Sequence, residues 1–109
     1  MEYDDIRQKI REYNWDDGLS FPKEILENPN CDLALALEIF YLADGYSYLD
    51  NSYGITGLTE WKAFISNLFN NILNGMFSKT GNSFEIPLTK VAKYKFRKNQ
   101  IPEVFLTDL

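Results

Sequence analysis

The chain has 109 residues and a net charge of −5, with a single cysteine and no histidine. Without histidine, the common Ser/His and Cys/His nucleophilic systems and the usual zinc sites cannot be assembled. One cysteine permits no disulfide within the chain, and the acidic balance favours basic partners over nucleic acid or anionic membrane. We therefore expect one small α-helical domain over residues 1–109 that binds another macromolecule and is not an enzyme.

The N-terminal third is predicted to form two helices separated by a turn. Residues 2–13 place apolar side chains three and four positions apart, which is typical of an amphipathic helix. Turn-forming residues follow at 14–18. A short helix is then expected from Pro22 to Glu27, since proline is favoured in a first helical turn.

The central element is predicted to be a buried helix over about residues 31–44. From Leu33 to Ala43 only Glu38 is charged, and a helix that is apolar nearly all round is buried on most sides. We expect Asn30 to cap its start and Gly45 to end it.

A loop and the strongest helical pattern follow. Residues 46–57 form a polar stretch with three tyrosines, and we expect a loop, because long loops in small domains are often functional. Over about 58–76, a stripe of apolar residues opposes a polar row, which predicts a long amphipathic helix. In this helix Trp61 is assigned to the core and Glu60 to the solvated face.

The C-terminal third gives weaker signals. A turn is predicted at 79–83 and a short extended piece near 84–86. Residues 90–98 alternate apolar and basic side chains as a strand does, but Pro87 just upstream favours a helix, which we adopt. A short proline-started helix is expected over 101–106. Since one isolated extended piece cannot make a sheet, the predicted fold is all-α, with five or six helices around the central one.

Three segments together resemble a known family: Asn14-Trp15-Asp16-Asp17-Gly18, Asn28-Pro29-Asn30-Cys31-Asp32, and the run from Ala36 to Gly45. The sequence Ile101-Pro102-Glu103-Val104-Phe105-Leu106 fits the same pattern. This resembles a family of short bacterial proteins catalogued only as a domain of unknown function. The resemblance implies a small bacterial cytoplasmic protein and supplies no catalytic residue. Families of this kind often include immunity proteins that neutralise a toxin.

Two features could carry chemistry, and for both we favour a structural role. Asp16 and Asp17, with Asp44 as a third carboxylate, could form a metal or acid/base site, but such residues more often cap helices and shape turns. Cys31 lies at a predicted helix start, where a thiolate is stabilised, yet no histidine or adjacent cation activates it. A buried structural cysteine is the better interpretation. We expect no catalytic residue, metal or cofactor.

Two other segments could bind partners. The 90–98 stretch holds five of the eleven basic residues, but the acidic remainder would repel phosphates, so a lysine-rich face around packed aromatics is favoured over nucleic-acid binding. The 46–57 stretch combines tyrosines, typical of interfaces, with carboxylates that attract a basic partner. The predicted partner-binding residues are Asp44, Tyr46, Tyr48, Asp50 and Tyr53, with Asp16 and Asp17 as secondary candidates.

These observations favour an immunity-type or other inhibitory domain that neutralises a basic partner, such as a nuclease toxin. The alternatives are a self-associating structural or adaptor domain, a carboxylate-only, metal-assisted enzyme, and nucleic-acid binding through residues 90–98. Residues 1–5 lack the features of a secretion signal, and the longest apolar runs are five residues. We therefore expect a cytoplasmic protein with no membrane partner.

Overall fold

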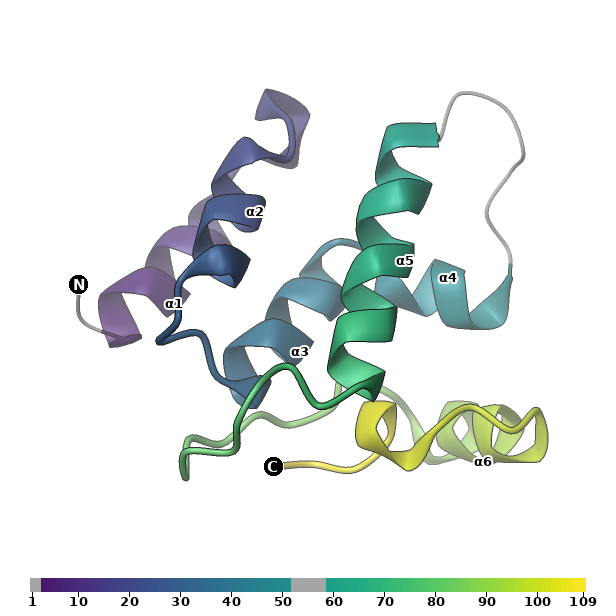
Figure 1. Ribbon diagram of the computed structural model, residues 1–109. Coiled ribbons are helices and arrows are strands. Elements are labelled where there is room, and N and C mark those ends of the chain that lie inside the picture. The colour runs from purple at the N-terminus through teal and green to yellow at the C-terminus, as the bar shows by residue number, and fades with distance from the viewer. Residues whose placement is uncertain (1–2, 52–58) are drawn as a thin grey trace.

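The computed structural model describes residues 3–51 and 59–109, except for the side chain of Thr59. Within these ranges the chain forms α-helices and short 3-10 helices and no strand, which confirms the all-α prediction (Figure 1). The elements are α1 (Tyr3–Glu12), η1 (Trp15–Asp17), α2 (Ser20–Glu27), α3 (Leu33–Leu42), α4 (Gly45–Asp50), α5 (Thr59–Leu73), α6 (Lys90–Lys98) and η2 (Glu103–Phe105). None of the helices in the described ranges is long and apolar enough to span a membrane.

Helix α3 lies at the centre of the fold, as its composition predicts. Every residue from Leu33 to Phe40 is buried, and α1, α4 and α5 all pack against the helix (Figure 1). Its one charged residue, Glu38, accepts hydrogen bonds from Nε of Arg7 at 2.7 Å and Nε of Arg11 at 2.6 Å. These pairs join α1 to α3 beside the buried side chains of Ile6 and Ile10.

The start of α3 differs from the prediction, because Asp32 caps the helix and Asn30 does not. The Asp32 carboxylate accepts from the backbone N–H of Leu35 at 2.9 Å, the usual geometry of an N-cap. It also accepts from three side chains that come from distant parts of the chain: Tyr3, Thr80 and Asn82. Asp32 therefore holds α1 and the 79–83 turn against the central helix.

The end of α3 also differs from the prediction. Gly45 does not take the left-handed position after the helix; Asp44 does, with φ of 64°. Gly45 instead begins α4, so residues 45–50 are helical and not loop. A Cβ at residue 45 would lie 2.6 Å from the carbonyl oxygen of Phe40 and closer still to its ring, so the close packing of α4 on α3 requires glycine here. The rest of the predicted loop, residues 52–57, lies outside the described ranges.

Helix α5 buries the stripe that its periodicity predicts: Phe64, Ile65, Leu68 and Ile72. The helix ends at Leu73 and not at 76, because Gly75 takes a positive φ of 76° and turns the chain. Leu73 and Met76, predicted in the stripe, are therefore exposed.

The C-terminal segment closes the core. Residues 90–98 are helical, as favoured, but Thr89 caps α6 and Pro87 does not begin it. No strand forms near 84–86, although Phe84 and Leu109 exchange two backbone hydrogen bonds. The short helix expected over 101–106 is the 3-10 helix η2, where the Phe105 ring stacks on Phe69 with centroids 4.6 Å apart.

Candidate protein-binding site

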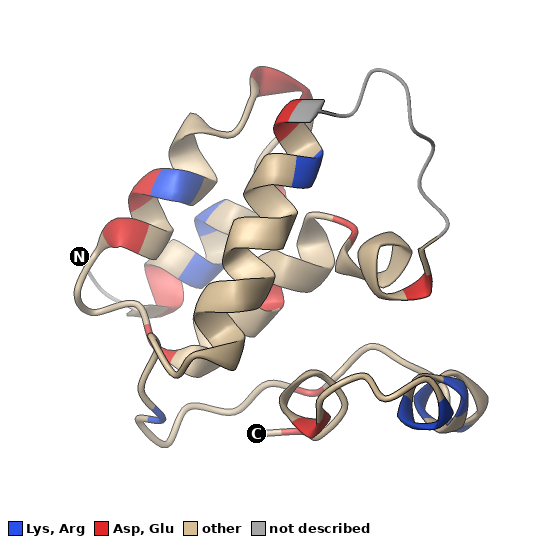
Figure 2. Cartoon of the chain, turned by 45° about the vertical axis from the view of Figure 1, so that its right-hand side comes forward, with Lys and Arg blue, Asp and Glu red and all other residues tan. Residues whose placement is uncertain are grey.

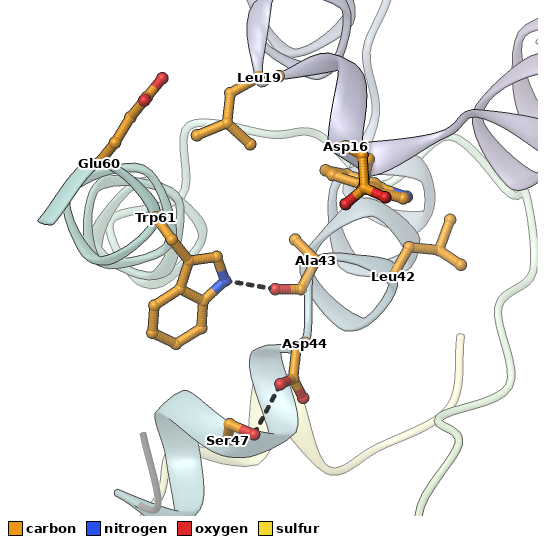
Figure 3. A pocket seen from close by; sticks show the side chains of 10 residues that line it. Asp16, Leu19, Leu42, Ala43, Asp44, Ser47, Glu60 and Trp61 are labelled. Atoms are coloured by element: carbon orange, nitrogen blue, oxygen red, sulfur yellow. Dashed lines mark hydrogen bonds between the residues drawn. The ribbon is translucent and has the colours of Figure 1, made fainter. Parts of the chain in front are cut away.

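A pocket of about 680 Å³ opens where η1, the α3–α4 junction and the start of α5 meet (Figure 3). Its walls are largely apolar, and three carboxylates lie among its lining residues. The lining residues are Trp15, Asp16, Gly18, Leu19, Leu42, Ala43, Asp44, Ser47, Glu60 and Trp61.

Trp61 forms one wall and is held by the end of α3. Its indole Nε1–H donates to the carbonyl oxygen of Ala43 at 2.7 Å (Figure 3). The last carbonyls of a helix have no partner within the helix, so this bond satisfies one of them and fixes the ring. The ring of Trp61 therefore lines the pocket, while its N–H is already bonded to Ala43.

The opposite wall is built by the turn between α1 and α2. Asn14 accepts from the backbone N–H of Asp16 and shapes η1, while Trp15 packs edge-on against Tyr13 with centroids 5.6 Å apart. The Tyr13 hydroxyl donates to the carbonyl oxygen of Gly18 at 2.7 Å. These contacts hold the indole of Trp15 in place within the turn.

Asp16 and Asp44 line the pocket from different elements, and the Asp44 carboxylate is turned toward Ser47 (Figure 3). Asp44 is fixed, because its Oδ2 accepts from Oγ of Ser47 at 2.7 Å. Glu60 points away from the centre of the pocket and adds negative charge at the rim (Figure 3). The residues found to line the pocket include no lysine or arginine, so its electrostatic potential favours a cationic group.

The structure divides the predicted partner-binding residues into two groups. Asp16 and Asp44 both line the pocket, whereas Asp17 is not one of its lining residues. Tyr46 and Tyr48 pack on aromatic rings of α6 and α5, Phe96 and Phe69 respectively. The third tyrosine, Tyr53, lies outside the described ranges.

Asp50 also belongs to the second group. It pairs with Nζ of Lys95 at 2.6 Å and thereby links α4 to α6. Of the described residues in this group, Tyr46 presents the largest area, with 41% of its surface exposed. Its role in binding stays a prediction, but the ring contacts of both tyrosines also stabilise the fold.

Sequence reasoning missed Trp61, Glu60, Leu19 and Leu42 as pocket residues. Trp61 packs against the core, as its place in the apolar stripe of α5 predicts, and it also lines the pocket from the first turn of the helix. Leu42 likewise continues the apolar run of α3 but is 39% exposed. The one available signal was an indole close to the start of an amphipathic helix.

The basic segment of α6 pairs with acidic residues of the same chain. Besides Lys95 with Asp50, Nε of Arg97 lies 2.8 Å from Oε1 of Glu103, and Nζ of Lys93 lies 3.8 Å from Oδ1 of Asp108. Figure 2 shows these cations gathered on α6, at a distance from the acidic η1. Three of the five basic residues are thus partly neutralised within the fold.

Cys31 is buried, which supports its structural interpretation. Burial, and to a lesser degree the charge of Asp32, raises the pKa of the thiol to about 12. A nucleophilic cysteine needs a lowered pKa and access to solvent, and Cys31 has neither. In the described part of the chain, no group of three or more acidic or cysteine side chains is arranged to hold a metal ion.

The fold and the pocket define an acidic, all-α domain with an aromatic-walled surface cavity. The chain belongs to the family described as Domain of unknown function (DUF4274), whose sequence profile matches residues 5–73. This confirms the resemblance to a family of unknown function, and every pocket residue falls within the matched region. No curated protein and no solved structure matches the chain.

Proposed function

We propose that this chain is an inhibitory binding protein that captures a basic partner protein on its pocket face, as an immunity protein captures a toxin. The observation that carries the proposal is the pocket itself, whose lining includes two tryptophans and two aspartates from separate elements. Tryptophan is strongly enriched among the residues that dominate binding energy at protein interfaces. Carboxylates beside such residues accelerate encounter with a basic partner and exclude acidic ones.

The charge of the whole chain supports the same proposal. The chain has sixteen acidic and eleven basic residues, and several of the basic ones are already paired within the fold. Toxins that cleave nucleic acid carry basic surfaces that hold phosphates. An acidic protein with an aromatic pocket is suited to cover such a surface.

The experiment is affinity capture of partners from the host lysate, with charge-neutralised variants as comparison. Asp16→Asn with Asp44→Asn removes two charges at the pocket. Asp5→Asn with Glu24→Gln removes two charges elsewhere and is the matched control, since both side chains are exposed and neither lines the pocket. We expect one stoichiometric basic protein, captured by the wild type and the control but lost with the pocket variant.

The salt dependence provides a second check. If carboxylates attract the partner, the association rate should fall steeply as ionic strength rises above about 0.1 M, where charges are screened beyond ~10 Å. A partner captured equally by both variants, or no basic partner at all, would contradict the proposal.

A second candidate function, self-association as an adaptor, is favoured by one surface of α6. Val91 and Tyr94 are 78% and 69% exposed and lie three positions apart, hence on one face of the helix. This cationic helix could dock on the acidic face of a second copy. Sedimentation over a range of concentrations separates the candidates. If the wild type and the variant with Val91→Ser and Tyr94→Ser are both monomeric at every concentration, the self-association hypothesis is contradicted.

A further inference from the structure

We propose that the pocket takes the side chain of an arginine presented by the partner. This inference rests on the proposed function and names the chemical group that the pocket recognises. It is carried by the position of two aspartates and two indole rings around one cavity.

The cavity is broadly open to solvent and has the volume of a ligand site. At about 680 Å³ it has room for a long side chain together with part of the backbone that carries it. Its walls come from η1, the α3–α4 junction and α5, and the hydrogen bond from Trp61 to Ala43 ties two of these elements together. The site is therefore formed before a ligand enters.

The arrangement of the acidic groups suits a guanidinium group. Asp16 and Asp44 both line the cavity and come from different elements, η1 and the α3–α4 junction, and Figure 3 shows the Asp44 carboxylate turned toward Ser47. Ser47 engages only Oδ2 of Asp44 and orients the carboxylate. A guanidinium group offers five N–H donors in a planar fork and can reach two acceptors at once.

The aromatic walls favour arginine over lysine. A guanidinium group stacks on an indole ring and sheds its hydration more easily than an ammonium group does. Trp61 has its N–H committed to Ala43, so it offers the ring and not a donor that would repel a cation. The aliphatic part of the arginine side chain can pack on Leu19, which also lines the cavity.

The test uses the two tryptophans of the chain as built-in reporters, since both line the pocket. In the ¹⁵N-labelled full chain their indole N–H signals are followed by NMR during titration with acetyl-Gly-Arg-Gly-amide. The matched peptides replace arginine by citrulline, which has the same shape without charge, or by lysine.

We expect both indole signals to shift with the arginine peptide, with an affinity at least tenfold weaker for citrulline and severalfold weaker for lysine. The Asp16→Asn, Asp44→Asn variant should lose the response, and the Asp5→Asn, Glu24→Gln control should keep it. Both variants are first checked for unchanged helical circular dichroism.

Equal shifts with citrulline, equal affinity for lysine, or no shift at millimolar arginine peptide would each overturn the arginine assignment. Partner capture and the peptide titration distinguish failure of the proposed function from failure of the arginine assignment. Pocket-dependent capture of a partner without a peptide response removes the arginine anchor and leaves the proposed function. A specific peptide response without any captured protein keeps the anchor and removes the proposed inhibitor.

Discussion

The buried Glu38 carboxylate receives the Nε–H of Arg7 at 2.7 Å, and this contact joins the central helix α3 to α1. Only 4% of the surface of Glu38 is exposed, and Arg7 is mostly covered too. Glu38 is the one charge in an otherwise apolar helix, so its interactions decide how α1 is positioned on the core.

Removal of Glu38 should be among the most damaging changes to this fold. Glu38→Ala leaves Arg7 without its buried counter-charge, and we expect a loss of about 3–5 kcal/mol in the free energy of unfolding. Arg11→Ala removes a half-exposed partner of the same carboxylate and should cost less than about 1 kcal/mol. Urea unfolding followed by circular dichroism measures both. Equal losses of stability would show that the buried Glu38–Arg7 pair contributes no more than the half-exposed Glu38–Arg11 pair.

Asp32 should make stability depend on acid pH. Burial raises the pKa of Asp32, but its hydrogen bonds, from Thr80 and Asn82 above all, outweigh that effect and hold the pKa below its ordinary value. A lowered pKa in the folded state stabilises the protein above the unfolded pKa of about 3.9, and this contribution is lost as pH falls further.

The matching variant is Asp32→Asn, which cannot accept as many hydrogen bonds. It should be less stable than the wild type at neutral pH, and the difference should shrink between about pH 4 and pH 2. Unfolding midpoints in urea across this range provide the measurement. A difference that stays constant with pH would mean that the charge of Asp32 contributes nothing.

Gly45→Ala should destabilise the α3–α4 junction by about 1–3 kcal/mol, the usual cost of overpacking. The new Cβ would overlap Phe40, including its backbone oxygen, which cannot rotate away. Asp44→Gly should be better tolerated than Asp44→Ala, since residue 44 has a left-handed backbone and both changes lose the same bond to Ser47. Thermal unfolding of the three variants decides the point; an unaffected Gly45→Ala would contradict the close packing.

Burial of apolar side chains, and not ion pairing, should hold α6 against the rest of the domain. Phe96 is fully buried against Tyr46, so Phe96→Ala is expected to cost about 3–5 kcal/mol. Lys95→Ala removes only the exposed pair with Asp50 and should have a small effect that disappears at high salt. Chemical unfolding at low and high salt compares the two. A larger loss for Lys95→Ala would reverse this ranking.

Cys31 should resist thiol reagents while the protein is folded. Its burial and raised pKa, about 12, leave almost no thiolate at pH 8. Labelling with a disulfide reagent should therefore be slow in buffer and fast in urea. Rapid labelling of the folded chain would instead indicate that Cys31 is accessible.

The sequence predicts best those helices whose own pattern of apolar residues shows which side chains are buried. The stripe from Phe64 to Ile72 and the apolar run of α3 both specify which face is covered, independently of the partner. The ends of α3 could not be predicted in this way. Asn30 and Asp32 are both good caps, and the distant residues Thr80 and Asn82 favour Asp32.

The pocket was only partly predictable for the same reason. Asp16 and Asp44 are recognisable as candidates, but whether both line one pocket depends on how the turn after α1 packs beside the end of α3. Whether Gly45 ends one helix or begins the next depends on its contact with Phe40, which no local pattern contains. Trp61 packs against the core, as its periodicity predicts, but that pattern does not indicate that it also lines the cavity.

The stacking of Phe105 on Phe69 has a consequence for where a working fragment of this protein can be cut. The family match ends at residue 73, yet Phe105 and Phe96, both from beyond it, are fully buried. A shortened chain that stops at the matched boundary would leave the rings of Phe40 and Phe69 facing water. The matched region holds the entire pocket, but it depends on the C-terminal segment to stay folded, so recognition and stability are assigned to different stretches of one chain.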